Sequence, residues 1–148
     1  MAVLTQNKKA YFDYEILEKF EAGLELKGIE AKSLRNGKGN ITGAHVIIRG
    51  EEAFIVGMDI PPYQPKNTAK EYDHQRTRKL LLKKKEIKYL MGKQQSAGLT
   101  LIPLKVYTVK SLIKLEMALA KGKKKYDKRE KIKEREGKRK IERTLKEI

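Results

Sequence analysis

The sequence predicts a small, mainly β antiparallel barrel with inserted helices, followed by a basic C-terminal tail. From residue 12 to residue 26, apolar side chains occupy most even positions and polar side chains most odd positions, which indicates one long strand or two strands bent near Gly23. Two later pairs of apolar runs are separated by short turn sequences, as in β-hairpins. Five or six short strands within about 115 residues fit a closed or nearly closed barrel.

The two expected hairpins pair residues 45–48 with 53–56 and residues 99–107 with 112–120. The first has β-branched strands and a glycine in its connecting turn. In the second, the apolar positions change from odd to even across Pro103, which suggests a β-bulge or an edge strand. The run 112–120 alternates regularly, so its odd-numbered apolar residues are expected to face the core.

Two helices are expected between the strands. Residues 28–35 contain helix formers and precede an Asn-Gly turn, which predicts a short helix. Asp73 is expected to cap a second helix that continues to Met91 and ends at one of the next two glycines. On that helix Leu81 would lie about 100° from Leu80, so it either joins the core or is an exposed apolar contact. Barrels of this size often follow the oligonucleotide/oligosaccharide-binding (OB) plan, an inference by analogy.

The chain is strongly basic, and its charge is unevenly distributed. Charged residues make up 36% of the sequence and the net charge is +16. Residues 1–120 carry 21 Lys and Arg against 13 Asp and Glu, whereas residues 121–148 carry 14 against 6, so each part has a net charge of +8. We therefore predict a basic barrel domain over 1–120 and a basic tail over 121–148, a pattern typical of proteins that bind polyanions.

The tail sequence favours a helix only in a complex. Four i,i+4 pairs with the acid leading support a helix, whereas Gly137 and the lack of a continuous apolar stripe oppose one. We expect the tail to be disordered alone and helical once a polyanion neutralises its lysines. Two alternatives stay open: a solvated tail that only aids solubility, and a helix on an anionic membrane, for which the tail has few large apolar residues.

The sequence contains little that indicates catalysis. It has no cysteine, no histidine–carboxylate cluster with metal-ligand spacing and no phosphate-binding loop of the GxxxxGK[ST] type. No apolar run approaches the 18 residues of a membrane span, and the first residues lack the pattern of a secretory signal. We therefore expect a cytoplasmic protein with no catalytic residues, no metal, no cofactor and no membrane partner.

Basic residues cluster where phosphate contacts would be favourable. Seven cations fall within 13 consecutive residues: Arg76, Arg78, Lys79, Lys83, Lys84, Lys85 and Lys88. A solvated outer face is the alternative for any single lysine, but the cluster as a whole favours a polyanionic partner. Tyr126 lies among the cations of the tail, an arrangement that fits stacking on an unpaired base.

Several motifs occur together, in order, from residue 7 to residue 135. They occupy residues 7–10, 20–23, 30–35, 76–82, 98–104, 120–129 and 132–135. On these motifs the chain resembles the small protein B family, the SsrA-binding proteins of bacterial trans-translation. The resemblance implies an OB-like barrel with embedded helices that binds the tRNA-like part of transfer-messenger RNA. It also implies delivery of that RNA to stalled ribosomes, and a tail that becomes helical in the empty mRNA channel.

The resemblance also implies which residues carry the function. In the family, the residues matching Asn7, Glu21 and Leu81 are implicated in RNA binding, and Glu21 is also on the polar face of its expected strand. The basic surface around them is expected to include Lys8, Lys32, Arg35, Arg76, Arg78, Lys79 and Lys84. The tail residues expected near the decoding centre are Lys123, Lys124, Tyr126, Asp127, Lys128, Arg129, Ile132, Lys133 and Arg135. The implied partners of a monomer are transfer-messenger RNA, the small-subunit rRNA of the ribosome and an elongation factor.

Other classes of protein stay open at this point. A structural ribosomal protein with a basic tail embedded in rRNA has the same charge pattern, and an RNA-modifying enzyme is a third possibility for which no site is evident. Residues 71–74 read Glu-Tyr-Asp-His where relatives often have Asn-His-Asp-Pro, so the course of the proline-containing loop over 61–75 is left open. The role of Tyr126 is open as well, because some relatives have histidine there.

Overall fold

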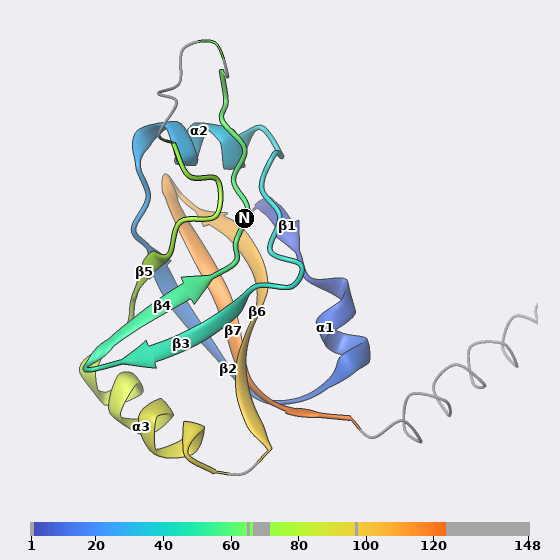
Figure 1. The fold of residues 1–148 in the computed structure, drawn as a ribbon, viewed down its shortest axis with the longest axis vertical. Coiled ribbons are helices and arrows are strands. Elements are labelled where there is room, and N and C mark those ends of the chain that lie inside the picture. Colours follow the sequence, from blue (N-terminus) through green and yellow to red (C-terminus); the bar gives the residue numbers. More distant parts are fainter. Residues whose placement is uncertain (1, 65, 67–71, 97, 124–148) are drawn as a thin grey trace, which may run out of the picture.

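The computed structural model describes residues 2–64, 66, 72–96 and 98–123, and within them seven strands form one antiparallel sheet (Figure 1). The strand order is β1-β6-β7-β2-β5-β4-β3. In chain order the elements are β1 (Ala2–Gln6), α1 (Lys8–Asp13), β2 (Tyr14–Leu24), α2 (Gly28–Arg35), β3 (His45–Arg49), β4 (Glu52–Val56), β5 (Arg78–Leu81), α3 (Lys84–Gln94), β6 (Leu99–Val109) and β7 (Leu112–Gly122). The predicted fold class, an antiparallel barrel-like sheet with inserted helices, is confirmed.

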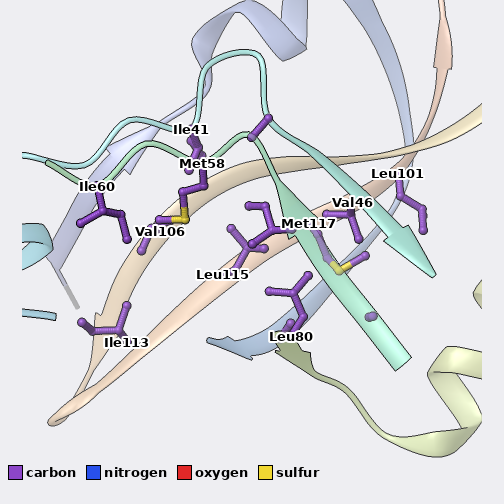
Figure 2. Close-up of a cluster of buried hydrophobic side chains, with 14 of the residues drawn as sticks. Ile41, Val46, Met58, Ile60, Leu80, Leu101, Val106, Ile113, Leu115 and Met117 are labelled. Carbon is purple, nitrogen blue, oxygen red and sulfur yellow. The ribbon is translucent and has the colours of Figure 1, made fainter. Parts of the chain in front are cut away.

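The sheet curves around one main hydrophobic core. The long strands β2, β6 and β7 form one wall, and the β3–β4 hairpin crosses over it, with α2 at one end of the barrel and α3 at the other (Figure 1). Figure 2 shows side chains from β5, β6, β7 and the segment after β4 within the same interior. Leu115 and Met117 are fully buried there, as the alternation of residues 112–120 predicts, and Leu80 on β5 is almost fully buried beside them.

Pro103 lies at a β-bulge. The register of β6 against β7 shifts between Pro103 and Lys105, which explains the change of apolar phase in the sequence. The edge-strand alternative is wrong, because β6 pairs with β1 on one side and β7 on the other. Asn7 supports the bulge from the neighbouring chain: its Nδ2 donates to the Pro103 carbonyl at 3.1 Å, and its backbone nitrogen to the Leu104 carbonyl at 2.7 Å.

The N-terminal region contains two elements that the alternation did not predict. The short helix α1 ends with residues 12 and 13, which the alternation places at the start of the first strand, and β1 precedes α1 and pairs with β6. The helix packs Ala10 on the outer face of the sheet, against Leu104, Ala118 and Ala120. Small and apolar residues at these outward positions leave room for a helix, and a helix there buries them.

The second predicted helix begins later than expected. Leu80 and Leu81 belong to β5, which pairs with β4 and with the end of β2, and α3 begins only at Lys84. Asp73 caps a turn instead of a helix, since its Oδ1 accepts from the Gln75 backbone nitrogen at 2.9 Å. The helix continues past Gly92 to Gln94 and ends before Gly98.

The segment between β4 and β5 is held to the barrel at both of its described ends. The Ile60 nitrogen donates to the His74 carbonyl at 2.9 Å, and the Tyr72 hydroxyl donates to the Ile60 carbonyl at 2.7 Å.

Residues 65, 67–71 and 97 lie outside the described residues, as do residues 124–148 of the tail. β7 extends to Gly122, slightly past the predicted end of the barrel domain at residue 120, and the division into domain and tail stays a prediction. No helix within the described residues is long and apolar enough to cross a membrane.

Candidate nucleic-acid interface

The outer face of β6, β7 and β2 carries a row of charged side chains. Glu116 on β7 is bound from both sides, by Lys19 at 3.4 Å and Lys105 at 3.2 Å. Its cross-strand partner on β2 is Glu21, on the same face of the sheet. Because Lys19 and Lys105 neutralise Glu116, Glu21 is the carboxylate of this pair without a cation bound to it among the described residues.

Glu21 is exposed and held in place by a tyrosine. The Tyr107 hydroxyl on β6 donates to Glu21 Oε2 at 2.5 Å, whereas Oε1 has no hydrogen bond within the described residues. Burial raises the pKa of Tyr107, and the hydrogen bond to Glu21 raises it further. Tyr107 therefore remains a protonated donor at all physiological pH values, and the carboxylate presents a fixed acceptor to solvent. Such an acceptor suits the amino groups of bases and the hydroxyls of ribose.

Leu81 lies beside Glu21 on the same face. It is the register partner of Gly23, which follows Glu21 by two positions and so points the same way. The Leu81 side chain is 54% exposed. Leu81 is therefore not a core residue, and its role as an apolar contact for RNA stays a prediction. The sheet thus places a fixed carboxylate next to an apolar side chain in solvent.

The basic residues predicted around this pair occupy several places. Lys32 and Arg35 are exposed on α2, and Arg35 Nη2 donates to the Ser111 carbonyl in the β6–β7 turn at 2.7 Å. Lys84 is exposed at the start of α3, whereas the half-buried Lys79 is 3.3 Å from Glu52 in an ion pair. The remaining predicted cation near the N-terminus, Lys8, is exposed at the start of α1.

Arg78 is not part of any exposed basic surface, which corrects the prediction for this residue. It has no exposed surface, and its guanidinium donates to Glu30, to the Met58 carbonyl at 2.7 Å and to the His74 carbonyl at 3.1 Å. Arg76, which is only partly exposed, donates to Glu30 Oε1 at 2.6 Å. The two arginines of the motif therefore bind a carboxylate of α2 inside the protein, and sequence alone gives no sign of that partner.

Glu30, Arg76 and Arg78 form a triad of charged side chains, in which Glu30 is the buried anion. Burial alone would raise its pKa, but hydrogen bonds from Arg76, the Lys27 backbone and Arg78 outweigh burial, and the pKa of Glu30 lies below its usual value. The triad fastens α2 to the segment that leads into β5. It thereby fixes the position of Leu81, which lies three residues after Arg78.

Asn7 occupies a different place from Glu21 and Leu81. It is almost completely buried beside the bulge of β6, where its side chain bonds to the Pro103 carbonyl. The structure therefore brings two of the three principal predicted RNA contacts together and gives Asn7 a supporting position.

Of the predicted tail residues, only Lys123 is described: it donates from its backbone to the Asp13 carbonyl at 3.0 Å and from Nζ to the Tyr11 carbonyl at 3.2 Å. Outside the described residues lie Lys124, Tyr126, Asp127, Lys128, Arg129, Ile132, Lys133 and Arg135.

Several residues of the face were not singled out by the sequence. The alternation of β7 does place Glu116 on the outer face. In β6, Val106 points into the core, so its neighbour Tyr107 points to the opposite face of the sheet. These patterns indicate which side of the sheet a residue is on. They do not indicate that Tyr107 reaches Glu21 two strands away, since that depends on the register between β6, β7 and β2.

The fold and this face define a class: a small, basic, OB-like β-barrel with a mixed polar and apolar outer surface. The chain belongs to the SmpB family, whose model, described as "SmpB protein", matches residues 4–147. The SsrA-binding protein of Syntrophobacter fumaroxidans is 51% identical over 97% of this chain and 89% of that protein. The SsrA-binding protein of Thermosipho africanus is 50% identical over 99% and 98%, respectively.

A solved structure is similar as well. The chain described as "tmRNA-SmpB: a journey to the center of the bacterial ribosome" superposes with a TM-score of 0.67 at 45% identity, over 81% of this chain and 84% of that one. The family resemblance carried by the sequence motifs is thus confirmed, along with the fold it implies.

Proposed function

We propose that this protein is a non-enzymatic adaptor that binds the tRNA-like part of transfer-messenger RNA and delivers it to stalled ribosomes for trans-translation. The observation that carries the proposal is the exposed pair Glu21 and Leu81 on one face of a barrel of the SmpB family. The names of the relatives, SsrA-binding proteins, and the solved tmRNA-SmpB structure support it. The adaptor works in the cytoplasm, with an elongation factor on the aminoacylated RNA.

The two kinds of group on this face have different roles in RNA binding. The net charge of +16 draws in any polyanion, and this attraction weakens as salt is added. Glu21 opposes that attraction, so a carboxylate at this point is useful only if it accepts hydrogen bonds from particular bases or riboses. Leu81 adds an apolar contact that an unpaired nucleotide can cover. Recognition therefore depends on the shape of the RNA in addition to its charge.

The tail is proposed to act on the ribosome. Its cations, with Tyr126 among them, suit the negatively charged channel that an mRNA normally fills. A ribosomal protein with an rRNA-embedded tail is the less favoured alternative. Such a protein would stay on ribosomes during washing with high salt, whereas an adaptor leaves.

Replacing Glu21 by alanine tests the proposed RNA contact. We expect the affinity for the tRNA-like fragment to fall by roughly 10- to 100-fold, since a hydrogen bond to a charged group contributes about 1.5–3 kcal/mol. The loss is expected although the substitution makes the protein more positive. The measurement is filter binding at physiological salt, with circular dichroism to verify the fold.

Glu15→Ala is the matched control for this experiment. Glu15 is exposed at the other end of the same strand, and its removal changes the net charge equally. We expect it to leave the affinity unchanged or slightly higher. If Glu21→Ala strengthens binding as much as Glu15→Ala does, the interaction is purely electrostatic and the contact assigned to Glu21 is wrong.

A further inference from the structure

A groove of about 360 Å³ opens between α2, the ends of β2 and β5, and the β6–β7 turn, and its lining includes Gly23, two positions after Glu21 on β2. Leu81 on β5, Leu112 at the start of β7 and Gly23 on β2 line it. Two cationic residues, Arg35 and Lys114, line it as well. Neither the sequence motifs nor the family resemblance assigns a role to Leu112, Lys114 or Gly23.

The two leucines are unusually exposed for apolar residues. Leu81 is 54% exposed and Leu112 is 58% exposed, more than any other large hydrophobic side chain among the described residues. Covering the exposed part of a leucine side chain is favourable relative to leaving it in water. Two such residues facing one groove therefore favour an occupant with an apolar surface.

Gly23 keeps the groove open. A Cβ at this position would lie 3.2 Å from Leu81 Cβ and 3.4 Å from Leu81 Cδ1. A side chain at position 23 would therefore displace Leu81 or occupy the groove itself. The glycine allows Leu81 to lie close over β2 while the space beside it stays free.

The charges around the groove indicate the chemistry of the occupant. Arg35 donates to the Ser111 carbonyl, which ties the β6–β7 turn to α2 and holds the guanidinium beside another residue of the groove lining. Lys114 supplies a second cation, and the Glu21 carboxylate lies two positions from Gly23 on the same face. An occupant with a flat apolar body, polar edges and a nearby negative charge complements this arrangement. An unpaired nucleotide has all three properties.

We propose that this groove binds one unpaired nucleotide of the RNA. Its base lies between Leu81 and Leu112, and its phosphate lies near Arg35 and Lys114. Glu21 accepts from the polar edge of that nucleotide or of its neighbour. The proposal rests on the RNA-binding function proposed above and specifies which chemical group the face recognises.

Leu112→Lys tests the groove, because the added positive charge alone would strengthen RNA binding, whereas a lysine in the place of the base would weaken it. The substitution adds a cation where the proposal places a base, so we expect roughly tenfold weaker binding of the tRNA-like fragment. Leu112→Ser, which adds no charge, is expected to weaken binding as well. Leu17→Lys is the control: Leu17 is also exposed and lies at the bulge of β2. It should bind at least as tightly as the unsubstituted protein. Thermal unfolding verifies that all three variants fold.

Chemical probing of the same fragment identifies the nucleotide. The unsubstituted protein is expected to protect one unpaired nucleotide that regains its reactivity with Leu112→Lys. If both Leu112 variants bind like the unsubstituted protein, or weaken binding with no such change in reactivity, the groove does not hold a base and the proposal is overturned. Failure of the unsubstituted protein to prefer the fragment over ordinary tRNA would instead contradict the RNA-binding function itself.

Discussion

Glu30→Gln is expected to lower the free energy of unfolding by about 3–5 kcal/mol at pH 7, since removing one partner of a buried ion pair leaves the other uncompensated. Glu30 and Arg78 have no exposed surface, and Arg76 completes the triad from a partly exposed position. Without the carboxylate, the guanidinium of Arg78 stays buried with no counter-charge. Urea unfolding of the intact chain measures the effect.

Glu86→Gln is the matched control for this substitution. Both glutamates are the third residue of their helices and accept from the backbone nitrogen of the residue before the helix, Lys27 for Glu30 at 2.8 Å and Lys83 for Glu86 at 3.2 Å. Glutamine also serves in such a capping box, so the control should lose less than about 1 kcal/mol. Equal small losses in both variants would contradict the role of the triad.

The same triad predicts how stability depends on pH. The pKa of Glu30 in the folded protein lies below the value of 4.5 expected for the unfolded chain. The unfolded chain therefore binds the proton first, and the stabilisation by Glu30 is complete above pH 4.5 and decreases as the pH falls through the folded-state pKa. The difference in unfolding free energy between the natural protein and Glu30→Gln should accordingly shrink in acid.

Truncation after Lys123 is expected to abolish the tagging of stalled peptides while RNA affinity at physiological salt changes little. The cut is placed there because β7 extends to Gly122 and Lys123 bonds to the carbonyls of Asp13 and Tyr11. The removed segment carries 12 Lys and Arg against 6 Asp and Glu, so it adds general attraction to RNA that salt screens. Translation of an mRNA without a stop codon in a purified system measures tagging.

A tail of the same composition in shuffled order is the control for charge. It restores the net charge without the order of residues around Tyr126, so we expect tagging to remain absent. Rescue of tagging by the shuffled tail would show that charge alone is sufficient. Equal loss of RNA affinity and of tagging on truncation would contradict the division of function between barrel and tail.

The sequence predicts those elements whose signals are local. Both hairpins and the helix α2 have regular alternation or a clear end signal, and they form where expected. The sequence predicts that Leu80 and Leu81 belong to the helix that Asp73 is expected to cap and that continues to Met91. Their strand exists because β4 and β2 lie on either side of it. Pairing between distant segments decided the structure there.

The site was predicted in part for a similar reason. Glu21 and Leu81 follow from motifs and are exposed on one face, but the groove requires Leu112 from a turn about 30 residues further along the chain. The sequence predicts Arg78 at the surface, since an arginine is ordinarily exposed. Its burial depends on Glu30, 48 residues earlier in the chain, and no local pattern shows that pairing.

The binding of the intact protein to the tRNA-like fragment of transfer-messenger RNA and to an ordinary tRNA, at several salt concentrations, tests the central claim most directly. Recognition by the face around Glu21 and Leu81 predicts a strong preference for the fragment that persists as salt increases. Equal affinities that fall together and steeply with salt would mean that the protein is a general polycation, and would contradict the account.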